Sequence, residues 1–123
     1  MDRWMFRLLK VLDAMETILF NIIDLGVFFE GDVGELIKEL NNIQRCEKEN
    51  LEDCKRSLMK IYYILLQYIN FLPQDEKEIV KESLKSFDSI IETVLSRYKD
   101  NNTLFETLKS FAISILSEIT EIS

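Results

Sequence analysis

The chain has 123 residues, of which 47% are hydrophobic and 30% are charged, and this length predicts one domain over residues 1–123. Its formal net charge is −7, with 22 Asp and Glu residues against 15 Lys and Arg residues. This excess of negative charge argues against a nucleic-acid binder and against docking on an anionic membrane, because phosphate groups would be repelled.

The first predicted helix starts near Trp4 and is apolar over much of its circumference. Two rows of apolar side chains run along it at spacings of three and four residues. A helix of this kind lies either at the centre of a fold or at an interface. The candidate interface residues come from the second row and from both ends of this segment: Trp4, Met5, Leu9, Leu12, Leu19, Ile23, Phe28 and Phe29.

Glycines mark the turn after the first helix, and a short second helix is predicted from Asp32 to Ile43 as a lateral piece. A polar stretch ends at Asn50, which is an expected N-cap for a third helix over residues 51–72. The heptad spacing of its apolar residues predicts the most buried helix of the fold, with aromatic residues such as Phe71 in the core. Pro73 ends this helix, because proline cannot continue the hydrogen-bond ladder.

Acidic residues after Pro73 favour a fourth helix, and its apolar side chains follow in heptad steps from Val80 to Tyr98. Thr103 and Glu106 fit a capping box at the start of the last helix. The pattern contains no convincing strand, and the loops are short. We therefore predict an all-α fold: an antiparallel bundle of four long helices plus one short helix, about five in total, with consecutive helices as neighbours.

Residue types that commonly take part in catalysis, metal binding or phosphate binding are scarce in this chain. Histidine is absent, which removes the usual general base and most transition-metal sites. The three glycines match no phosphate-binding loop. We predict no catalytic residues, no cofactor and no metal. The alternative is a small-ligand-binding or enzymatic bundle that uses buried carboxylates, and inward-pointing Asp or Glu side chains with raised pKa values would distinguish it.

Cys46 and Cys54 are the two cysteines of the chain. On one continuous helix they would be about 12 Å apart, which is too far for a disulfide. If the chain reverses at Asn50, midway between them, they face each other across a helical hairpin and can bond. Two free thiols are the other alternative, because disulfides are uncommon in a reducing cytosol.

The expected location is the cytoplasm. The longest uncharged apolar stretch, from Ile61 to Gln74, has about 14 residues, whereas a membrane-spanning helix needs roughly 20. Asp13 and Glu16 interrupt the apolar segment that a secretory signal would require. The composition also suits a viral or a thermophile protein, and a viral protein would act in the host cytoplasm.

The function that these features favour is a non-enzymatic protein–protein interaction module. Such a module is an adaptor, a small subunit of an assembly, or a virus- or phage-type antagonist that blocks a partner. Missing catalytic residue types, acidic charge and surplus apolar side chains on the first helix support this class. We expect a protein partner, and first of all a homodimer through the first helix, since twofold pairing is the commonest oligomer geometry.

Overall fold

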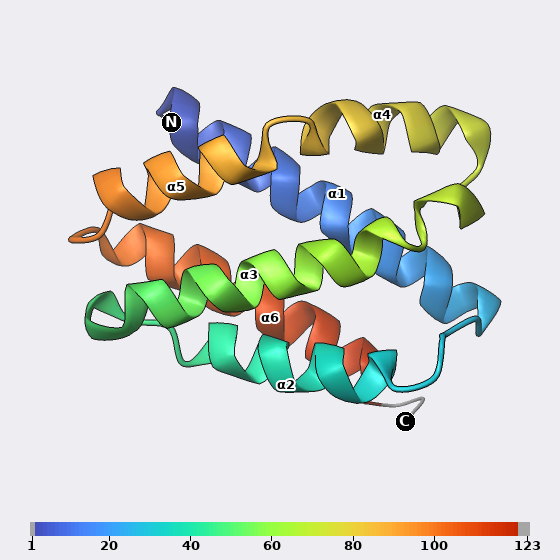
Figure 1. Cartoon of the computed structure of the whole chain (residues 1–123). Helices are drawn as coiled ribbons and strands as arrows, with labels where there is room; N and C mark the ends of the chain where they lie inside the picture. Colours follow the sequence, from blue (N-terminus) through green and yellow to red (C-terminus); the bar gives the residue numbers. More distant parts are fainter. Residues whose placement is uncertain (1, 121–123) are drawn as a thin grey trace.

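A computed structural model describes residues 2–120 of the chain, and within that range every regular element is helical (Figure 1). The prediction of an all-α bundle is confirmed. There are six α-helices and two short 3-10 helices in the described part. Their bounds are α1 Arg3–Leu25, α2 Asp32–Gln44, η1 Lys48–Asn50, α3 Leu51–Leu66, η2 Ile69–Phe71, α4 Gln74–Leu84, α5 Phe87–Arg97 and α6 Asn102–Ile119.

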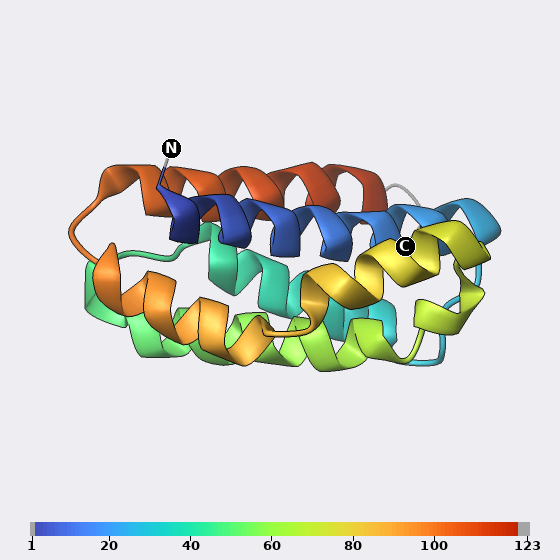
Figure 2. The same cartoon turned by 90° about the horizontal axis from the view of Figure 1, so that it is seen from above.

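The helices close a ring around one core, in the spatial order α1, α6, α2, α3, α5 and back to α1, while α4 packs on α1 (Figure 2). In this ring α1 and α6 lie side by side and run in the same direction. Of the α-helices that follow one another in the described chain, α2 and α3 alone are in extensive contact. The expectation that consecutive helices would be antiparallel neighbours therefore holds for that pair and not for the bundle as a whole.

The short second helix is not a lateral piece. Its contacts with α6 and α3 are the most extensive between any two elements, and Leu36, Leu40 and Ile43 are completely buried. Three such side chains contribute about 1.5–3 kcal/mol each to folding when they are removed from water. α2 is therefore one of the helices that enclose the core of the bundle.

Two predicted helices are interrupted. The third ends at Leu66 instead of Leu72, and the 3-10 turn of η2 covers part of the remainder. The fourth divides at Lys85 and Ser86 into α4, which packs on α1, and α5, which packs on both α1 and α3. Neither glycine nor proline occurs at this break. The change of neighbours explains it, since one straight helix cannot follow both contacts.

The helix ends follow capping chemistry. Asp2 caps α1 by accepting a hydrogen bond from the backbone N–H of Trp4 at 2.8 Å. This bond gives a partner to one of the first backbone N–H groups, which have none inside the helix. The cap of α6 is Asn101, whose side chain accepts from the backbone N–H of Thr103. The N-cap therefore lies two residues before the predicted Thr103, because Asn is a better cap than Thr, and the predicted capping box does not form, since Leu104 occupies the position where the box needs Glu or Gln.

A polar contact joins α2 to α3 inside the bundle. Glu39 is 1% exposed, and its Oε1 accepts hydrogen bonds from Ser57 at 2.9 Å and from Asn42 at 3.2 Å. Its Oε2 lies 3.4 Å from the ammonium of Lys60. Burial raises the pKa of this carboxyl, but the hydrogen bonds and Lys60 outweigh burial and bring the pKa below its ordinary value of 4.5.

Acid should therefore weaken the α2–α3 contact. A carboxyl with a lowered pKa in the folded chain stabilises it above pH 4.5, and that contribution is lost as the pH falls through the lower folded value. In chemical unfolding at a series of pH values, the wild type should be more stable than Glu39→Gln at neutral pH, and the difference should shrink in acid. A difference that is constant with pH would contradict this role of Glu39.

Candidate functional site

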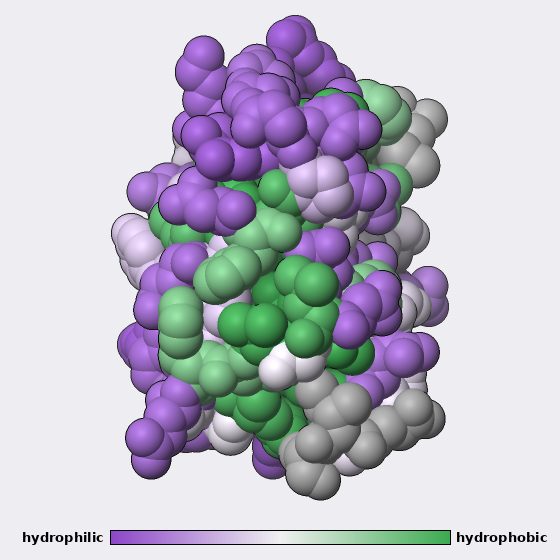
Figure 3. Space-filling view, turned by 90° about the vertical axis from the view of Figure 1, so that its right-hand side faces the viewer, coloured by the Kyte–Doolittle hydropathy of each residue, from purple (hydrophilic) through white to green (hydrophobic). Residues whose placement is uncertain are grey.

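Four exposed apolar side chains gather at one end of the bundle, where α1 ends and η2 leads into α4; we call them the apolar end surface. Leu25 is 54% exposed, Val27 37%, Phe29 43% and Phe71 41%. The rings of Phe29 and Phe71 are 6.3 Å apart between centroids. Figure 3 faces this end and shows hydrophobic side chains at its centre with hydrophilic ones around them. Contiguous exposed apolar surface of this kind usually marks an interaction site.

Tyr68 holds the loop between α1 and α2, which carries Val27 and Phe29 of this surface. Its buried hydroxyl donates a hydrogen bond to Asp32 Oδ2 at 2.6 Å and accepts one from the backbone N–H of Phe29 at 2.8 Å. The two aromatic rings of Phe29 and Tyr68 stack at 4.8 Å. Gly26 and Gly31 bound the loop at φ 67° and 87°, in the left-handed region that favours glycine. Val27 and Phe29 are therefore carried by a loop held in one shape, between the end of α1 and the 3-10 turn η2, and this lowers the entropy cost of binding.

Negative charges flank the apolar end surface along the chain. Asp24 precedes Leu25, Glu30 follows Phe29, and Asp75 stands in the first turn of α4; all three acidic residues are exposed. Exposed carboxylates around an apolar centre repel acidic partners and attract basic ones. The electrostatics of this end therefore favour a partner that carries positive charge.

The predicted interface residues divide between the core and the surface. Met5, Leu12 and Leu19 are buried among the helices of the same chain, so these three side chains are not available to another molecule. The other five are at least partly exposed, and they lie at both ends and along one side of α1: Trp4, Leu9, Ile23, Phe28 and Phe29. The central position of α1 explains its apolar circumference, because α3, α4, α5 and α6 all contact it.

At the N-terminal end of α1, a cationic side chain lies near each of the aromatic rings of Trp4 and Phe6. The guanidinium of Arg7 lies 4.8 Å from the centroid of a Trp4 ring, and the ammonium of Lys10 lies 5.4 Å from that of Phe6. Both distances fit cation–π contacts, so these two ring faces already interact with cations of the same chain. The apolar end surface is flanked by acids instead, and it is the better candidate for a contact site.

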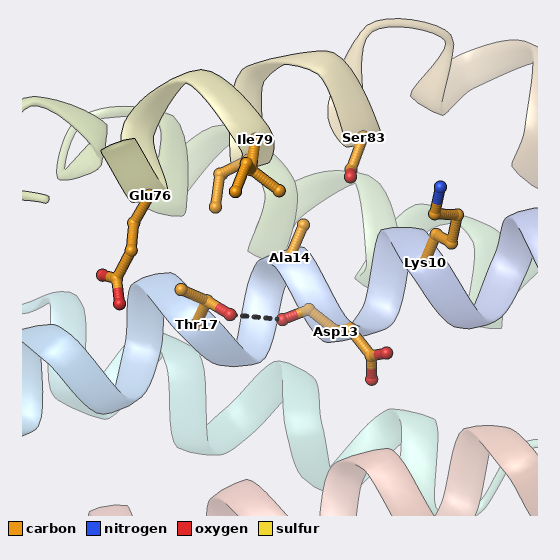
Figure 4. Close-up of a pocket in the computed structure, with 8 residues that line it drawn as sticks. Lys10, Asp13, Ala14, Thr17, Glu76, Ile79 and Ser83 are labelled. Carbon is orange, nitrogen blue, oxygen red and sulfur yellow. Dashed lines mark hydrogen bonds between the residues drawn. The ribbon is translucent and has the colours of Figure 1, made fainter. Parts of the chain in front are cut away.

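A groove of about 340 Å³ runs along the contact between α1 and α4 (Figure 4). The small side chains of Ala14 and Ser83 leave this space, and Ile79 of α4 projects beside it. Its charged residues, such as Asp13 and Glu76, are exposed. The groove therefore offers apolar contact area but no desolvated reactive group.

A second groove, of about 520 Å³, runs between α1 and α6 and contains Glu16. Burial, and to a lesser degree the charge of Asp13, raises the pKa of this half-buried carboxyl. Glu39 is the one carboxylate in the described residues that is fully buried, and its pKa is lowered. The described chain thus does not bring together two inward carboxylates with raised pKa values, which was the expected mark of the ligand-binding or enzymatic alternative.

Cys46 and Cys54 are joined by a disulfide, with their Cα atoms 5.7 Å apart. The chain reverses between them, as the hairpin alternative required. Asn50 closes this turn, because its side chain accepts from the backbone N–H of Glu47 and donates to the carbonyl of Arg45. Disulfides are typical of oxidising compartments and of intracellular proteins of hyperthermophiles, so the cytoplasmic location stays a prediction.

Within residues 2–120, no three His, Cys, Asp or Glu side chains converge in the manner of a metal site. None of the helices described is both long enough and apolar enough to cross a bilayer. Comparisons of the chain with models of protein families, with curated proteins and with solved structures give no match.

Sequence reasoning missed part of the apolar end surface. Leu25 and Val27 were not among the candidates, and Phe71 was expected in the core as part of a long third helix. Because α3 ends at Leu66, Phe71 faces outward. The signal that was available is the run of apolar residues around Gly26, since a loop rarely carries so many apolar side chains without a partner.

Proposed function

We propose that this chain is a non-enzymatic protein-interaction module and that the apolar end surface is its contact site. The observation that carries this proposal is the set of four exposed apolar side chains, two of them aromatic, of which Val27 and Phe29 lie on a loop fixed by Tyr68. Aromatic side chains held in place contribute much of the energy at protein interfaces. An adaptor, an assembly subunit and an antagonist all remain compatible with it.

The partner that fits best is a protein segment with apolar side chains flanked by Lys or Arg. Leu25, Val27, Phe29 and Phe71 would bury its apolar part. Asp24, Glu30 and Asp75 would attract its positive charges and raise the rate of association.

A homodimer through this surface is less favourable, because twofold pairing would set the acidic flanks of the two copies against each other. Pairing along the whole length of α1 would need side chains that the fold already buries, including Met5, Leu12 and Leu19. Self-association is therefore an alternative outcome of the test.

Two synthetic amphipathic peptides test this proposal. One alternates a leucine face with lysines, and the other has glutamate in place of every lysine. Fluorescence anisotropy with the full chain should show binding of the lysine peptide and at least about tenfold weaker binding of the glutamate peptide. Leu25→Ser and Phe71→Ser should each weaken binding of the lysine peptide by about tenfold.

The matched control is Ile113→Ser, which removes an exposed apolar side chain of α6 outside the apolar end surface. It should leave binding unchanged. Equal weakening by Ile113→Ser, equal affinity for the two peptides, or no binding at all would overturn the proposal. Light scattering across a concentration series provides the further check: a dimer that Leu25→Ser dissociates would favour a second copy instead.

A further inference from the structure

Few buried side chains attach α4 to the bundle. The other five α-helices close the ring around the core, and among the described elements α1 alone is in extensive contact with α4 (Figure 2). Val80 and Leu84, one turn apart, are the two buried side chains of α4, whereas each ring helix buries at least four. Burial therefore stabilises the position of α4 much less than the position of any ring helix.

Polar side chains do not tie α4 to the rest of the described chain. The ion pairs within residues 2–120 all join residues outside α4. The side-chain hydrogen bond between Gln74 and Glu78 stays within the helix. Pro73 before α4 and Ser86 after it lie outside the helical conformation, and neither side chain caps a helix. Apolar packing on α1 is thus what holds α4 in place.

The segments on both sides of α4 are anchored more firmly. Before α4, Leu72 is buried, and the carbonyl of Phe71 accepts a hydrogen bond from the side chain of Asn21 of α1 at 3.2 Å. After α4, Phe87 is buried, and its ring stacks on that of Tyr62 with 4.1 Å between the centroids. The residues between these anchors, 73–86, form a segment that can come loose while both neighbours stay in place.

We propose that α4 is a releasable cover of α1: residues 73–86 detach and unfold as one unit while the five-helix ring stays folded. α4 has 11 residues, and isolated helices shorter than about 12–15 residues are marginal in water, so the detached segment melts. The ring does not need α4 in order to close, because its five helices contact one another in a cycle. Opening of such a unit costs less free energy than global unfolding.

Release of α4 uncovers one side of α1. Ala14 is 5% exposed, points toward α4 and lines the groove together with Ile79 and Val80 (Figure 4). Lys10 and Thr17 line the same groove four residues before and three residues after Ala14, so they lie on the same face of α1. The open form therefore presents a strip of α1 that α4 covers in the closed form. In this sense α4 is an internal inhibitor of contacts with that strip.

Native-state hydrogen exchange on the full chain, followed by mass spectrometry, tests the release. The backbone amides of residues 78–84 in α4 should exchange at least about 100-fold faster than those of residues 58–64 in α3, because opening of α4 precedes global unfolding. Val80→Ala removes two buried methyl groups from the contact with α1. It should speed exchange in α4 by about tenfold.

Val94→Ala is the matched control, because Val94 is fully buried in α5 of the ring. It destabilises the closed and open forms equally, so it should speed exchange in α3 by about tenfold and leave exchange in α4 unchanged. Equal exchange of α4 and α3 in the wild type would overturn the proposal. So would acceleration of α4 by Val94→Ala as large as that by Val80→Ala, or no acceleration of α4 by Val80→Ala.

A thiol placed on α1 measures the uncovering itself. The two cysteines of the chain are paired with each other, so Ala14→Cys introduces a unique free thiol. Iodoacetamide should alkylate Ala14→Cys at least about 100-fold faster than Ala112→Cys, which places the thiol at a fully buried position of α6.

Adding Val80→Ala should speed alkylation of Ala14→Cys by about tenfold, whereas adding Val94→Ala should leave it unchanged. Equal rates for the two thiols would mean that α1 is uncovered only by global unfolding, and a rate at Ala14→Cys that Val80→Ala does not alter would mean that α4 does not cover it. Either result contradicts the proposal. If a cysteine variant does not fold, the exchange measurement decides.

Discussion

Replacing Tyr68 by phenylalanine should lower the free energy of unfolding by about 1–3 kcal/mol. The ring remains, so its packing in the core and its stacking on Phe29 are kept. What is lost is the hydroxyl that donates to Asp32 and accepts from the backbone N–H of Phe29. Both groups then lack a partner at a partly buried site, and chemical unfolding followed by circular dichroism measures the cost.

Tyr63→Phe is the matched control, because this tyrosine is 56% exposed. Removal of its hydroxyl should change the free energy of unfolding by less than about 0.5 kcal/mol. The same destabilisation in both variants would remove Tyr68 from its assigned role. Because Tyr68 anchors the loop of the apolar end surface, Tyr68→Phe should also weaken binding of the lysine peptide.

Alkaline pH gives an independent measurement on Tyr68. Burial, with a further effect of the hydrogen bond to Asp32, raises the pKa of its phenol from 10.0 to about 12. A group whose pKa is raised in the folded chain stabilises that chain below pH 10, and the contribution is lost as the pH rises through about 12. A titration of phenolate absorbance should show a phase at about pH 12 that Tyr68→Phe lacks.

Reduction of the disulfide between Cys46 and Cys54 should destabilise the chain by roughly 2.5 kcal/mol. The bond joins residues separated by eight positions, and it stabilises the fold mainly by limiting the unfolded chain. Because the turn joins α2 to α3, the bond also restrains a closely packed pair of helices. Unfolding curves with and without a thiol reductant measure the difference.

The double variant Cys46→Ala/Cys54→Ala is the control for this experiment, and its stability should not respond to the reductant. Coincident curves for the wild type with and without the reductant would mean that the thiols are free in solution. That result would restore the alternative of two unpaired cysteines.

Periodicity was sufficient to predict the class of fold and the positions of most helices, because a long apolar row at helical spacing rarely occurs outside a helix. It did not predict the break at Lys85 and Ser86, since no residue there disfavours a helix strongly and tertiary contacts decide. Periodicity also could not predict which helices lie next to one another. Short loops favour contact between consecutive helices, but the ring places α1 beside α6.

The candidate sites were less accessible to sequence reasoning than the fold. Surplus apolar residues near Phe28 and Phe29 were recognised, yet α1 uses most of its circumference inside the bundle. The burial of Glu39 could not be predicted, because a single acidic residue on a short helix is usually solvated. Its burial depends on Ser57 and Asn42, whose positions relative to Glu39 are set only by the packing of α2 on α3.

The ring order has a consequence for synthesis on the ribosome. α1 is made before α4, α5 and α6, which together provide most of its contacts. During translation the apolar side chains of α1 therefore stay exposed until the last helix has emerged. Nascent chains are prone to aggregate during such a period. Slow elongation over the final helices would prolong that exposure, and chaperones that hold apolar segments would find their target at the very start of the bundle.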